Sequence, residues 1–244
     1  MVITASQDQV KIEVIKMKKV GIIFALKEEL DETKKIFDNE KIHYKYNLKI
    51  YECRNNNVIC FLVESGMGKV NAARSTQILI DSMNVDYILN VGVAGSISKK
   101  INICDVVIGE KLVQHDFDFT LFNYEKGEIP GIGKYIKCDD RLVEIAKKIK
   151  IDTNVSVGVI SSGDIFISDE KMSLKINKKF NALCVEMEGA AIAQVCYLCN
   201  IPFLVVRAIS DSPYEKDNHI VYEDFLKISS DMAAKFILQF INNI

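Results

Sequence analysis

The sequence predicts a single α/β domain in which a central mixed, mostly parallel β-sheet is flanked by α-helices. Two observations predict this fold class. Short, continuously apolar runs of strand length alternate with segments whose apolar residues have helical spacing, and 244 residues are enough for one sizeable core. No linker, composition break or repeat interrupts the chain. We therefore expect one domain at residues 18–244, preceded by a flexible extension at residues 1–17.

The first half of the chain alternates predicted strands with predicted helices. Residues 19–26 (KVGIIFAL) are continuously apolar, which is typical of a strand covered on both faces. The charged segment at residues 27–37 has spaced apolar residues and is predicted to be a helix. The elements expected next are strands at 42–53 and 58–64 with a turn at 54–57, a helix at 68–83, a buried strand at 86–91 that ends in a small-residue turn at 92–96, and a short strand at 105–109.

The second half begins with the least regular region, residues 111–137. Long loops in compact domains are often functional or interfacial. Asp139 or Asp140 can cap the helix that follows. That helix is expected to end at about residue 150. The elements expected after it are a strand at 155–161, helices at 169–178 and 186–198, a strand at 202–209 and a polar loop at 212–221. The C-terminal helix has an apolar face that carries Phe225, Ile228, Met232, Phe236 and Phe240.

Charge and hydropathy argue against several classes of function. The formal net charge is −2 and the pI is about 6.0, with both signs interspersed, so no basic stripe is offered to nucleic acid. The sequence has no run of about 18 or more apolar residues that would predict a membrane span. Residues 1–17 lack the apolar stretch of a signal peptide. We expect a cytoplasmic protein that binds neither nucleic acid nor membranes.

Cysteine and histidine usage predicts neither a metal site nor a cofactor. The seven cysteines are an odd number and lie mostly in apolar runs, which is typical of free thiols in a reducing compartment. Cys196-x-x-Cys199 lies in a helical pattern, where core packing is favoured over a redox role. The three histidines are far apart and show no ligand spacing.

Acidic residues gather at predicted element ends. Glu186 and Glu188 flank Met187 at the start of a predicted helix, and Asp211 stands where a buried strand runs out. Acids at such ends usually face a cleft. A group of carboxylates suits cleavage of a glycosidic bond, which needs one group to donate a proton and another to activate water. Arg207 lies in the same apolar strand and needs an acidic partner if it is buried.

Each of these residues also has a structural interpretation. Glu28 and Glu29 open a predicted helix, where acids commonly stabilise the helix dipole. A general base at a strand end is the functional alternative. Met187 can be a core residue, and Asp211 can cap a turn.

Two glycine-containing segments, residues 66–69 and 92–95, are compatible with a ligand site or with a plain turn. Neither is a Walker A loop or a GxGxxG motif. Ligands of open α/β sheets lie outside the carboxyl ends of the strands. We predict a shared pocket there, because five short segments, several of them with small or acidic residues, follow predicted strands: residues 26–29, 66–68, 92–95, 166–167 and 211.

Seven segments carry a resemblance to a known family. They are GIIFALKEEL, SGMGKVNAA, NVGVAGS, HDFDFT, SSGDIFI, VEMEGAAIA and VVRAISD. In order and spacing they resemble the 5′-methylthioadenosine/S-adenosylhomocysteine nucleosidases of the purine nucleoside phosphorylase/uridine phosphorylase superfamily, from about residue 18 to residue 241. The resemblance implies a nucleoside phosphorylase-like fold, no cofactor, hydrolysis of an N-glycosidic bond with release of adenine, and a place in methionine salvage.

The resemblance implies two catalytic residues. Asp211 would protonate N7 of adenine, held by Ser210, and Glu29 would activate the attacking water, with Arg207 nearby. Protonation of N7 asks Asp211 to be neutral near pH 7, which burial favours because it disfavours the charged form. Anionic glutamates would stabilise the oxocarbenium-like sugar.

The resemblance also implies substrate contacts. Glu188 would bind the ribose hydroxyls, and Phe166 would stack on adenine. The other substrate-binding residues would be Leu26 and Met67 on the thioalkyl and ribose side, Val93 where many relatives carry serine, Ile167 with its backbone at the edge of the base, Glu186, Met187 against the sugar, Arg207, Ser210, and Tyr222 over the 5′ substituent. Phe119, Tyr124 and Pro130 would come from a neighbouring subunit, which implies a homodimer.

Three alternatives remain beside this hydrolase. A phosphorylase on the same fold would need cationic or N–H donors for phosphate, whereas the chain has only four arginines and places an acid at Glu29; hydrolysis is therefore favoured. An aminodeoxyfutalosine nucleosidase would have nearly the same pocket. A non-catalytic nucleoside-binding protein would be expected to lose one of the acids, but Glu29, Glu188 and Asp211 are all present.

Overall fold

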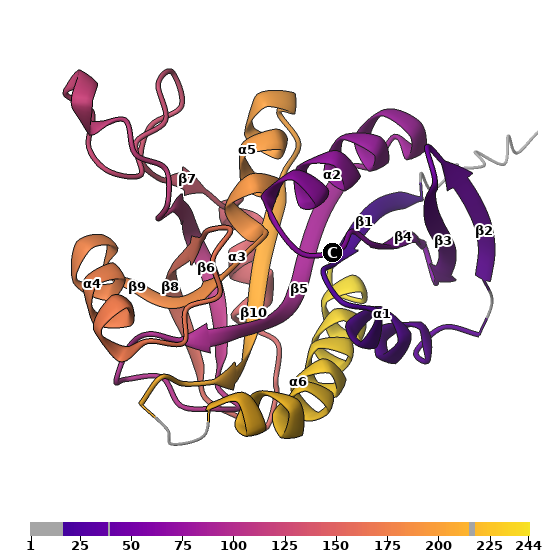
Figure 1. Ribbon diagram of the computed structural model, residues 1–244. Helices are drawn as coiled ribbons and strands as arrows, with labels where there is room; N and C mark the ends of the chain where they lie inside the picture. Colours follow the sequence, from indigo (N-terminus) through magenta and orange to yellow (C-terminus); the bar gives the residue numbers. More distant parts are fainter. Residues whose placement is uncertain (1–16, 39, 215–217) are drawn as a thin grey trace, which may run out of the picture.

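One mixed sheet organises the computed structural model, which describes residues 17–38, 40–214 and 218–244, without the side chains of residues 218–225 (Figure 1). The predicted extension therefore lies, except for Met17, outside the described residues. The strands are β1 (Lys18–Phe24), β2 (Glu40–Lys45), β3 (Leu48–Asn55), β4 (Val58–Glu64), β5 (Tyr87–Ser96), β6 (Val106–Gln114), β7 (Ile136–Lys137), β8 (Val155–Ser162), β9 (Ala182–Glu186) and β10 (Phe203–Asp211).

The strand order is β10-β6-β8-β9-β5-β1-β4-β3-β2, and β10 also pairs with β5. Five strands therefore close into a ring, and β1, β4, β3 and β2 extend from β5 as an open sheet. Strand β5 pairs in parallel with both β1 and β10, whereas β10 pairs antiparallel with β6. This mixed α/β architecture confirms the predicted fold class.

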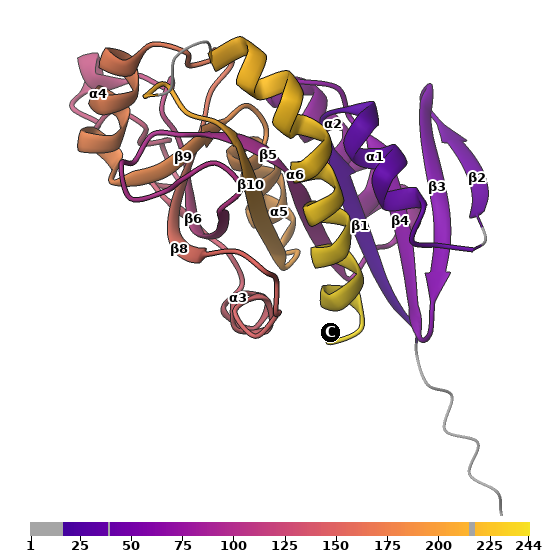
Figure 2. The same cartoon turned by 90° about the horizontal axis from the view of Figure 1, so that it is seen from below.

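Helices cover both faces of the sheet. They are α1 (Lys27–Lys34), α2 (Lys69–Met83), α3 (Asp140–Ala146), α4 (Glu170–Phe180), α5 (Gly189–Cys199) and α6 (Asn218–Ile241), with a 3₁₀ turn η1 (Thr120–Phe122). Figure 1 shows α2 and α5 above the sheet and α1 and α6 below it. Seen from below, α6 runs along β10 and β5 (Figure 2). No helix among the described residues is long and apolar enough to span a bilayer.

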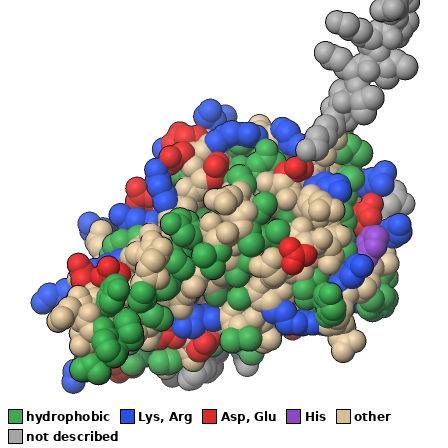
Figure 3. Space-filling view, turned by 90° about the horizontal axis from the view of Figure 1, so that it is seen from above, with side chains coloured by type: hydrophobic (Ala, Val, Ile, Leu, Met, Phe, Trp, Pro, Cys, Tyr) green, Lys and Arg blue, Asp and Glu red, His purple; other side chains and the backbone are tan. Residues whose placement is uncertain are grey.

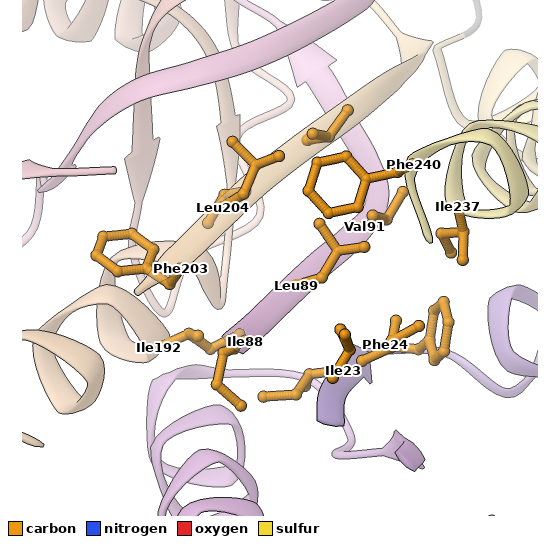
Figure 4. Close-up of a cluster of buried hydrophobic side chains, with 14 of the residues drawn as sticks. Ile23, Phe24, Ile88, Leu89, Val91, Ile192, Phe203, Leu204, Ile237 and Phe240 are labelled. Carbon is orange, nitrogen blue, oxygen red and sulfur yellow. The ribbon is translucent and has the colours of Figure 1, made fainter. Parts of the chain in front are cut away.

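The core lies on both faces of the central strands, against α2 and α5 on one face and α6 on the other. All nine residues of β10 are buried, as are five successive residues of β1. Side chains of β1, β5 and β10 meet Ile237 and Phe240 of α6 (Figure 4). Continuous apolar runs are the expected sequence of strands covered on both faces, so the run at residues 19–26 led to the correct prediction of β1.

Several predicted boundaries are wrong. The strand expected at 42–53 is a hairpin of β2 and β3, whose turn places Tyr46 at φ 47° and Asn47 at φ 63°. The turn expected at 92–96 is part of β5, which continues to Ser96 because it pairs there with β9 and β10. The strand expected at 105–109 is longer, since β6 continues to Gln114 into the region predicted to be irregular.

Two helix predictions also need correction. Glu186 ends β9 instead of opening a helix, and α5 begins only at Gly189. The loop expected at 212–221 was predicted to end too late, because α6 already begins at Asn218. The apolar face predicted for this helix is buried at Phe236 and Phe240, but the Ile228 side chain is 48% exposed; the side chain of Phe225 lies outside those described.

All seven cysteines are free. Cys196 is fully buried, and burial raises the pKa of its thiol. The Sγ atom of Cys199 instead lies 3.6 Å from Oε1 of Gln77 on α2. The Cys196-x-x-Cys199 pair therefore belongs to helix packing. Within the described residues, no group of three or more His, Cys, Asp or Glu side chains is arranged to hold a metal ion.

Candidate active site

A cavity of about 640 Å³, including its open mouth, lies at the carboxyl ends of the parallel strands. It is lined by the last residues of β5, β9 and β10 and by the segments that follow β1, β4 and β8. The predicted site residues that the structure brings together here are Leu26, Glu29, Met67, Val93, Phe166, Ile167, Glu186, Met187, Glu188, Arg207, Ser210 and Asp211. Ala94 and Gly95 belong to the segment at residues 92–95 that was predicted to line the pocket. Sequence reasoning missed Ala25, Ile165 and Val185, all of which lie within the motifs quoted above.

The Glu29 carboxylate is buried and held by three backbone N–H groups. At the third position of α1, it reaches back to accept hydrogen bonds from Ala25 and Leu26 through Oε2, each at 3.1 Å, and it accepts the Val93 N–H through Oε1 at 2.9 Å. Burial raises the pKa of Glu29, while Arg207 and the three N–H groups act in the opposite direction. A buried, oriented carboxylate with a raised pKa suits a general base. The solvated-acid interpretation fits only its exposed neighbour Glu28.

Glu186 and Arg207 form a buried ion pair beneath the cavity. The Arg207 guanidinium donates through Nη2 to Glu186 and to Asn90. Glu186 also accepts the Ser162 hydroxyl and the backbone N–H groups of Glu188, at 3.0 Å, and Gly189, at 2.7 Å. Glu186 is thus the acidic partner predicted for Arg207. Both of its oxygens are engaged by protein donors that fix the start of α5.

Glu188 joins the end of β9 to the start of α2. Its Oε1 atom accepts the Gly68 N–H at 2.8 Å. Gly66 and Gly68 have φ of 80° and 94°, a region that residues other than glycine rarely adopt, so this turn requires glycine. Burial, together with the nearby Glu186 charge, raises the pKa of Glu188 to about 7.

Asp211 ends β10, where only 2% of its surface is exposed. The Ser210 hydroxyl donates to Asp211 Oδ1 at 2.8 Å. A Cβ atom added to Gly95 would lie 3.0 Å from Asp211 Oδ2, so the absence of a side chain at residue 95 gives the carboxyl group its room. Glu29 follows β1 and Asp211 ends β10, and β5 separates these two strands; at about 4.8 Å per strand, the strands are about 10 Å apart. Both acids line the same cavity.

The mouth of the cavity is apolar. The side chains of Met67, Ile165 and Phe166 are 62%, 48% and 50% exposed, whereas Ile167 is buried behind them. Exposed large apolar side chains beside a polar interior are typical of a site for a partly apolar, planar ligand. Arg207 is the only lysine or arginine that lines the cavity in the described part of the chain, and its charge is already paired with Glu186.

Three predicted site residues do not line this cavity, and a fourth has a side chain outside the described residues. Phe119, Tyr124 and Pro130 lie between β6 and β7 and do not line the cavity of their own chain. The Phe119 ring packs on Phe122 and Tyr124, at centroid distances of 4.4 and 5.4 Å. Tyr222 belongs to the part of α6 whose side chains lie outside the described residues.

Comparison with known proteins places this site in a family. A family model described as the phosphorylase superfamily matches residues 19–242. The chain belongs to this superfamily. A 5′-methylthioadenosine/S-adenosylhomocysteine nucleosidase of Geobacillus sp. is 38% identical over 231 residues, covering 93% of this chain and 99% of the relative. This agrees with the resemblance found in the sequence motifs.

Solved structures of the superfamily share the fold. The S-adenosylhomocysteine nucleosidase of Streptococcus pyogenes, solved in complex with 5-methylthiotubericidin, has a TM-score of 0.89 at 35% identity, covering 93% of this chain and 97% of that one. The futalosine hydrolase of Helicobacter pylori also has a TM-score of 0.89, at 29% identity, covering 93% and 99%. The two similar scores show that the fold alone does not distinguish these substrates.

Proposed function

We propose that this protein hydrolyses the N-glycosidic bond of 5′-methylthioadenosine and S-adenosylhomocysteine and releases adenine. The similarity to nucleosidases over nearly the whole chain supports this activity. One structural observation carries it: two buried carboxyl groups line one cavity, Glu29 from the helix that follows β1 and Asp211 from the end of β10. One acid can donate a proton while the other takes one.

In the proposed reaction, Asp211 donates its proton to N7 of adenine, and Ser210 orients the acid. The bond between N9 and C1′ breaks and its electrons move into the protonated purine. Glu29 takes a proton from a water molecule, whose oxygen forms the new bond to C1′. Positioned acid–base groups contribute roughly 10²–10⁴-fold to the rate, and the negative charge near the sugar stabilises its oxocarbenium character.

The remaining cavity residues are assigned to binding. Glu188 accepts hydrogen bonds from the ribose hydroxyls, and Met187 packs against the sugar. Phe166 stacks on adenine, and the Ile167 backbone lies at the edge of the base. Leu26, Met67 and Val93 line the ribose and 5′-substituent side. Glu186 and Arg207 hold the start of α5, and with it Glu188, in place. We assign Tyr222 to the 5′ substituent.

Hydrolysis is favoured over phosphorolysis because the cavity offers phosphate no unpaired cation in the described residues. The test is to incubate the pure protein with 5′-methylthioadenosine, with and without phosphate, and to identify the sugar product. Release of free methylthioribose at the same rate with and without phosphate would support the proposal. Formation of a ribose 1-phosphate would identify a phosphorylase instead.

Aminodeoxyfutalosine is the second candidate substrate, favoured by the likeness to futalosine hydrolase. Incubation with 5′-methylthioadenosine, S-adenosylhomocysteine, aminodeoxyfutalosine and inosine in parallel gives kcat/KM for each. We expect the two adenosine thioethers to be the best substrates. A preference for aminodeoxyfutalosine would reassign the substrate without changing the reaction.

We also propose a homodimer in which Phe119, Tyr124 and Pro130 reach the site of a neighbouring subunit. Large apolar side chains are exposed on this segment and on α2, with Leu121 86%, Phe122 59% and Val70 78% exposed. Hydrophobic side chains gather on the face that carries these elements (Figure 3). Exposed apolar patches commonly mark association surfaces. Light scattering of wild type and Leu121→Asp tests this: we expect a dimer that the variant weakens, and a monomeric, fully active wild type would reject it.

The domain limits and the setting are proposed on the same basis. Residues 18–244 form the catalytic domain, and residues 1–17 lie outside it. Seven free cysteines fit a reducing compartment, so we place the protein in the cytoplasm, where its reaction would serve methionine salvage.

A further inference from the structure

Three segments meet beside the cavity in a closed ring of hydrogen bonds. The carboxylate of Asp116, just after β6, accepts two hydrogen bonds. Its Oδ1 atom lies 2.8 Å from the Lys69 ammonium nitrogen, and its Oδ2 atom lies 3.0 Å from the Asp164 backbone nitrogen. Asp164, after β8, in turn accepts the backbone N–H of Lys69 at 2.8 Å. Lys69 is the first residue of α2. The ring therefore joins the start of α2 to the segment after β8 in two ways, directly through the Asp164 carboxylate and indirectly through the Asp116 carboxylate.

The ring is shielded and closely packed. The side chains of Lys69 and Asp116 are only 20% and 18% exposed, and charge-assisted hydrogen bonds in such places are stronger than surface ion pairs. Burial raises the pKa of Asp116, but hydrogen bonds from Lys69 and Asp164 outweigh it and hold the pKa below its usual value. A Cβ atom added to Gly163 would lie 2.4 Å from His115 Nε2 and 3.1 Å from Asp116 Cγ, so the two segments are in direct contact.

The two ends of the ring lead to opposite parts of the proposed nucleoside site. On the α2 side, Gly68 precedes Lys69 and donates its N–H to Glu188, the proposed ribose ligand. On the other side, Phe166 lies two residues beyond Asp164 and is the proposed contact for adenine. Neither Lys69 nor Asp116 lines the cavity.

We propose that Asp116 is a positioning residue that sets the separation between the adenine contact, Phe166, and the ribose contact, Glu188. It acts through Asp164 and Lys69 and does not enter the chemistry. The inference rests on the proposed function, because it names the part of the nucleoside that each side of the ring serves. Loss of the Asp116 charge leaves only the hydrogen bond from the Lys69 backbone N–H to Asp164 between the two sides. This looser link weakens binding of the ground state and of the transition state equally.

The test compares Asp116→Asn, Lys69→Met and the double variant with wild type in adenine release from 5′-methylthioadenosine. Asp116→Asn removes the ion pair. Lys69→Met removes the ammonium, which also donates to Gln114 Oε1 at 3.0 Å, and keeps the backbone N–H that donates to Asp164. We expect KM to rise about tenfold in each single variant while kcat stays within about twofold. The double variant should be no worse than Lys69→Met alone, because both substitutions remove the same Lys69–Asp116 pair.

The matched control is Asp231→Asn, which breaks an exposed lysine–aspartate pair on α6, where Asp231 lies 2.6 Å from Lys235. It should leave KM unchanged. A fall in kcat at constant KM, additive effects in the double variant, or an equal rise in the control would overturn the positioning role. If Asp116→Asn does not fold, Lys69→Met decides by the same criteria.

A failure of the proposed function can be distinguished from a failure of the positioning role. If wild type releases no adenine, the function is rejected. The positioning role is then judged by calorimetric binding of 5′-methylthioadenosine to wild type and to Lys69→Met. About tenfold weaker binding to the variant supports the role, and equal or undetectable binding to both proteins rejects it.

Discussion

Glu29 Oε1 lies 2.9 Å from the backbone nitrogen of Val93, 64 residues further along the chain. This hydrogen bond joins the first turn of α1 to the central strand β5. The other oxygen of Glu29 is held by its own N-cap region, through Ala25 and Leu26. The carboxylate is therefore fixed by two separate elements, and its replacement affects both chemistry and folding.

Glu29→Gln should lower adenine release at least about 10²-fold, because an amide cannot take the proton of water. The amide NH₂ group must also face a backbone N–H, which costs about 1–3 kcal/mol of stability. Binding of a non-hydrolysable adenosine analogue should persist. The checks are kcat, urea unfolding and calorimetry, with the exposed neighbour Glu28→Gln as the control. Loss of analogue binding in a folded variant would indicate a structural role for Glu29.

Asp211→Asn should reduce kcat by about 10²–10⁴-fold, since the amide has no acidic proton for N7. The side chain keeps its shape and can still accept the Ser210 hydroxyl, so the thermal midpoint should change little. Circular dichroism and adenine release measure the two effects. Full activity in the variant would exclude Asp211 as the proton donor.

Gly92→Ala should disturb the base without touching the substrate. The added Cβ atom would lie 2.6 Å from Glu29 Oε1 and 3.0 Å from Arg207 Nη1, so the carboxylate must move. We expect kcat to fall at least about tenfold and stability to fall by about 1–3 kcal/mol. In the control Gly21→Ala, the added Cβ atom would lie 2.7 Å from Ile88 Cδ1 and 3.0 Å from Leu79 Cδ1, which do not line the cavity, so stability should fall while kcat is unchanged. An active Gly92→Ala enzyme would contradict the close packing.

Glu188 should make stability depend on pH. Burial, with Glu186 nearby, raises its pKa from 4.5 to about 7, so in this interval the folded protein binds more protons than the unfolded chain. The free energy of unfolding contributed by Glu188 is therefore present at low pH and is lost as the pH rises from about 4.5 to about 7. Between pH 5 and pH 8, wild type should lose at least about 1 kcal/mol relative to Glu188→Gln, as urea unfolding would show. A constant difference would mean that Glu188 is ionised throughout.

The strands of the core could be predicted from the sequence because each is covered on both faces and is therefore continuously apolar. The hairpin of β2 and β3 was missed because its turn uses Tyr46 and Asn47 and no glycine. Conversely, the glycines of residues 92–95 suggested a turn, although they lie in β5. Gly92 makes room for Glu29 and Arg207, which are 63 and 115 residues away, and no local pattern contains that information.

The candidate site shows the same limit. Acids at strand ends led to Glu29, Glu188 and Asp211, all of which line the cavity. Sequence spacing did not separate the task of Glu186 from that of Glu188, because the difference comes from Ser162 and Arg207 on other strands. Lys69 and Asp116 lie in two of the quoted motifs, but their pairing depends on the position of the start of α2 beside the end of β6, which only the three-dimensional structure reveals.

Strand β10 pairs with β5 on one side and with β6 on the other, although both of those strands precede it in the chain by about 90 residues or more. During synthesis, the edges of β5 and β6 that pair with β10 therefore stay unpaired until β10, in the last fifth of the polypeptide, has emerged from the ribosome. Unpaired edges of this kind are prone to aggregate. The exposed edges therefore favour aggregation of the incomplete chain, and the acid at residue 211 arrives together with the strand that completes the sheet.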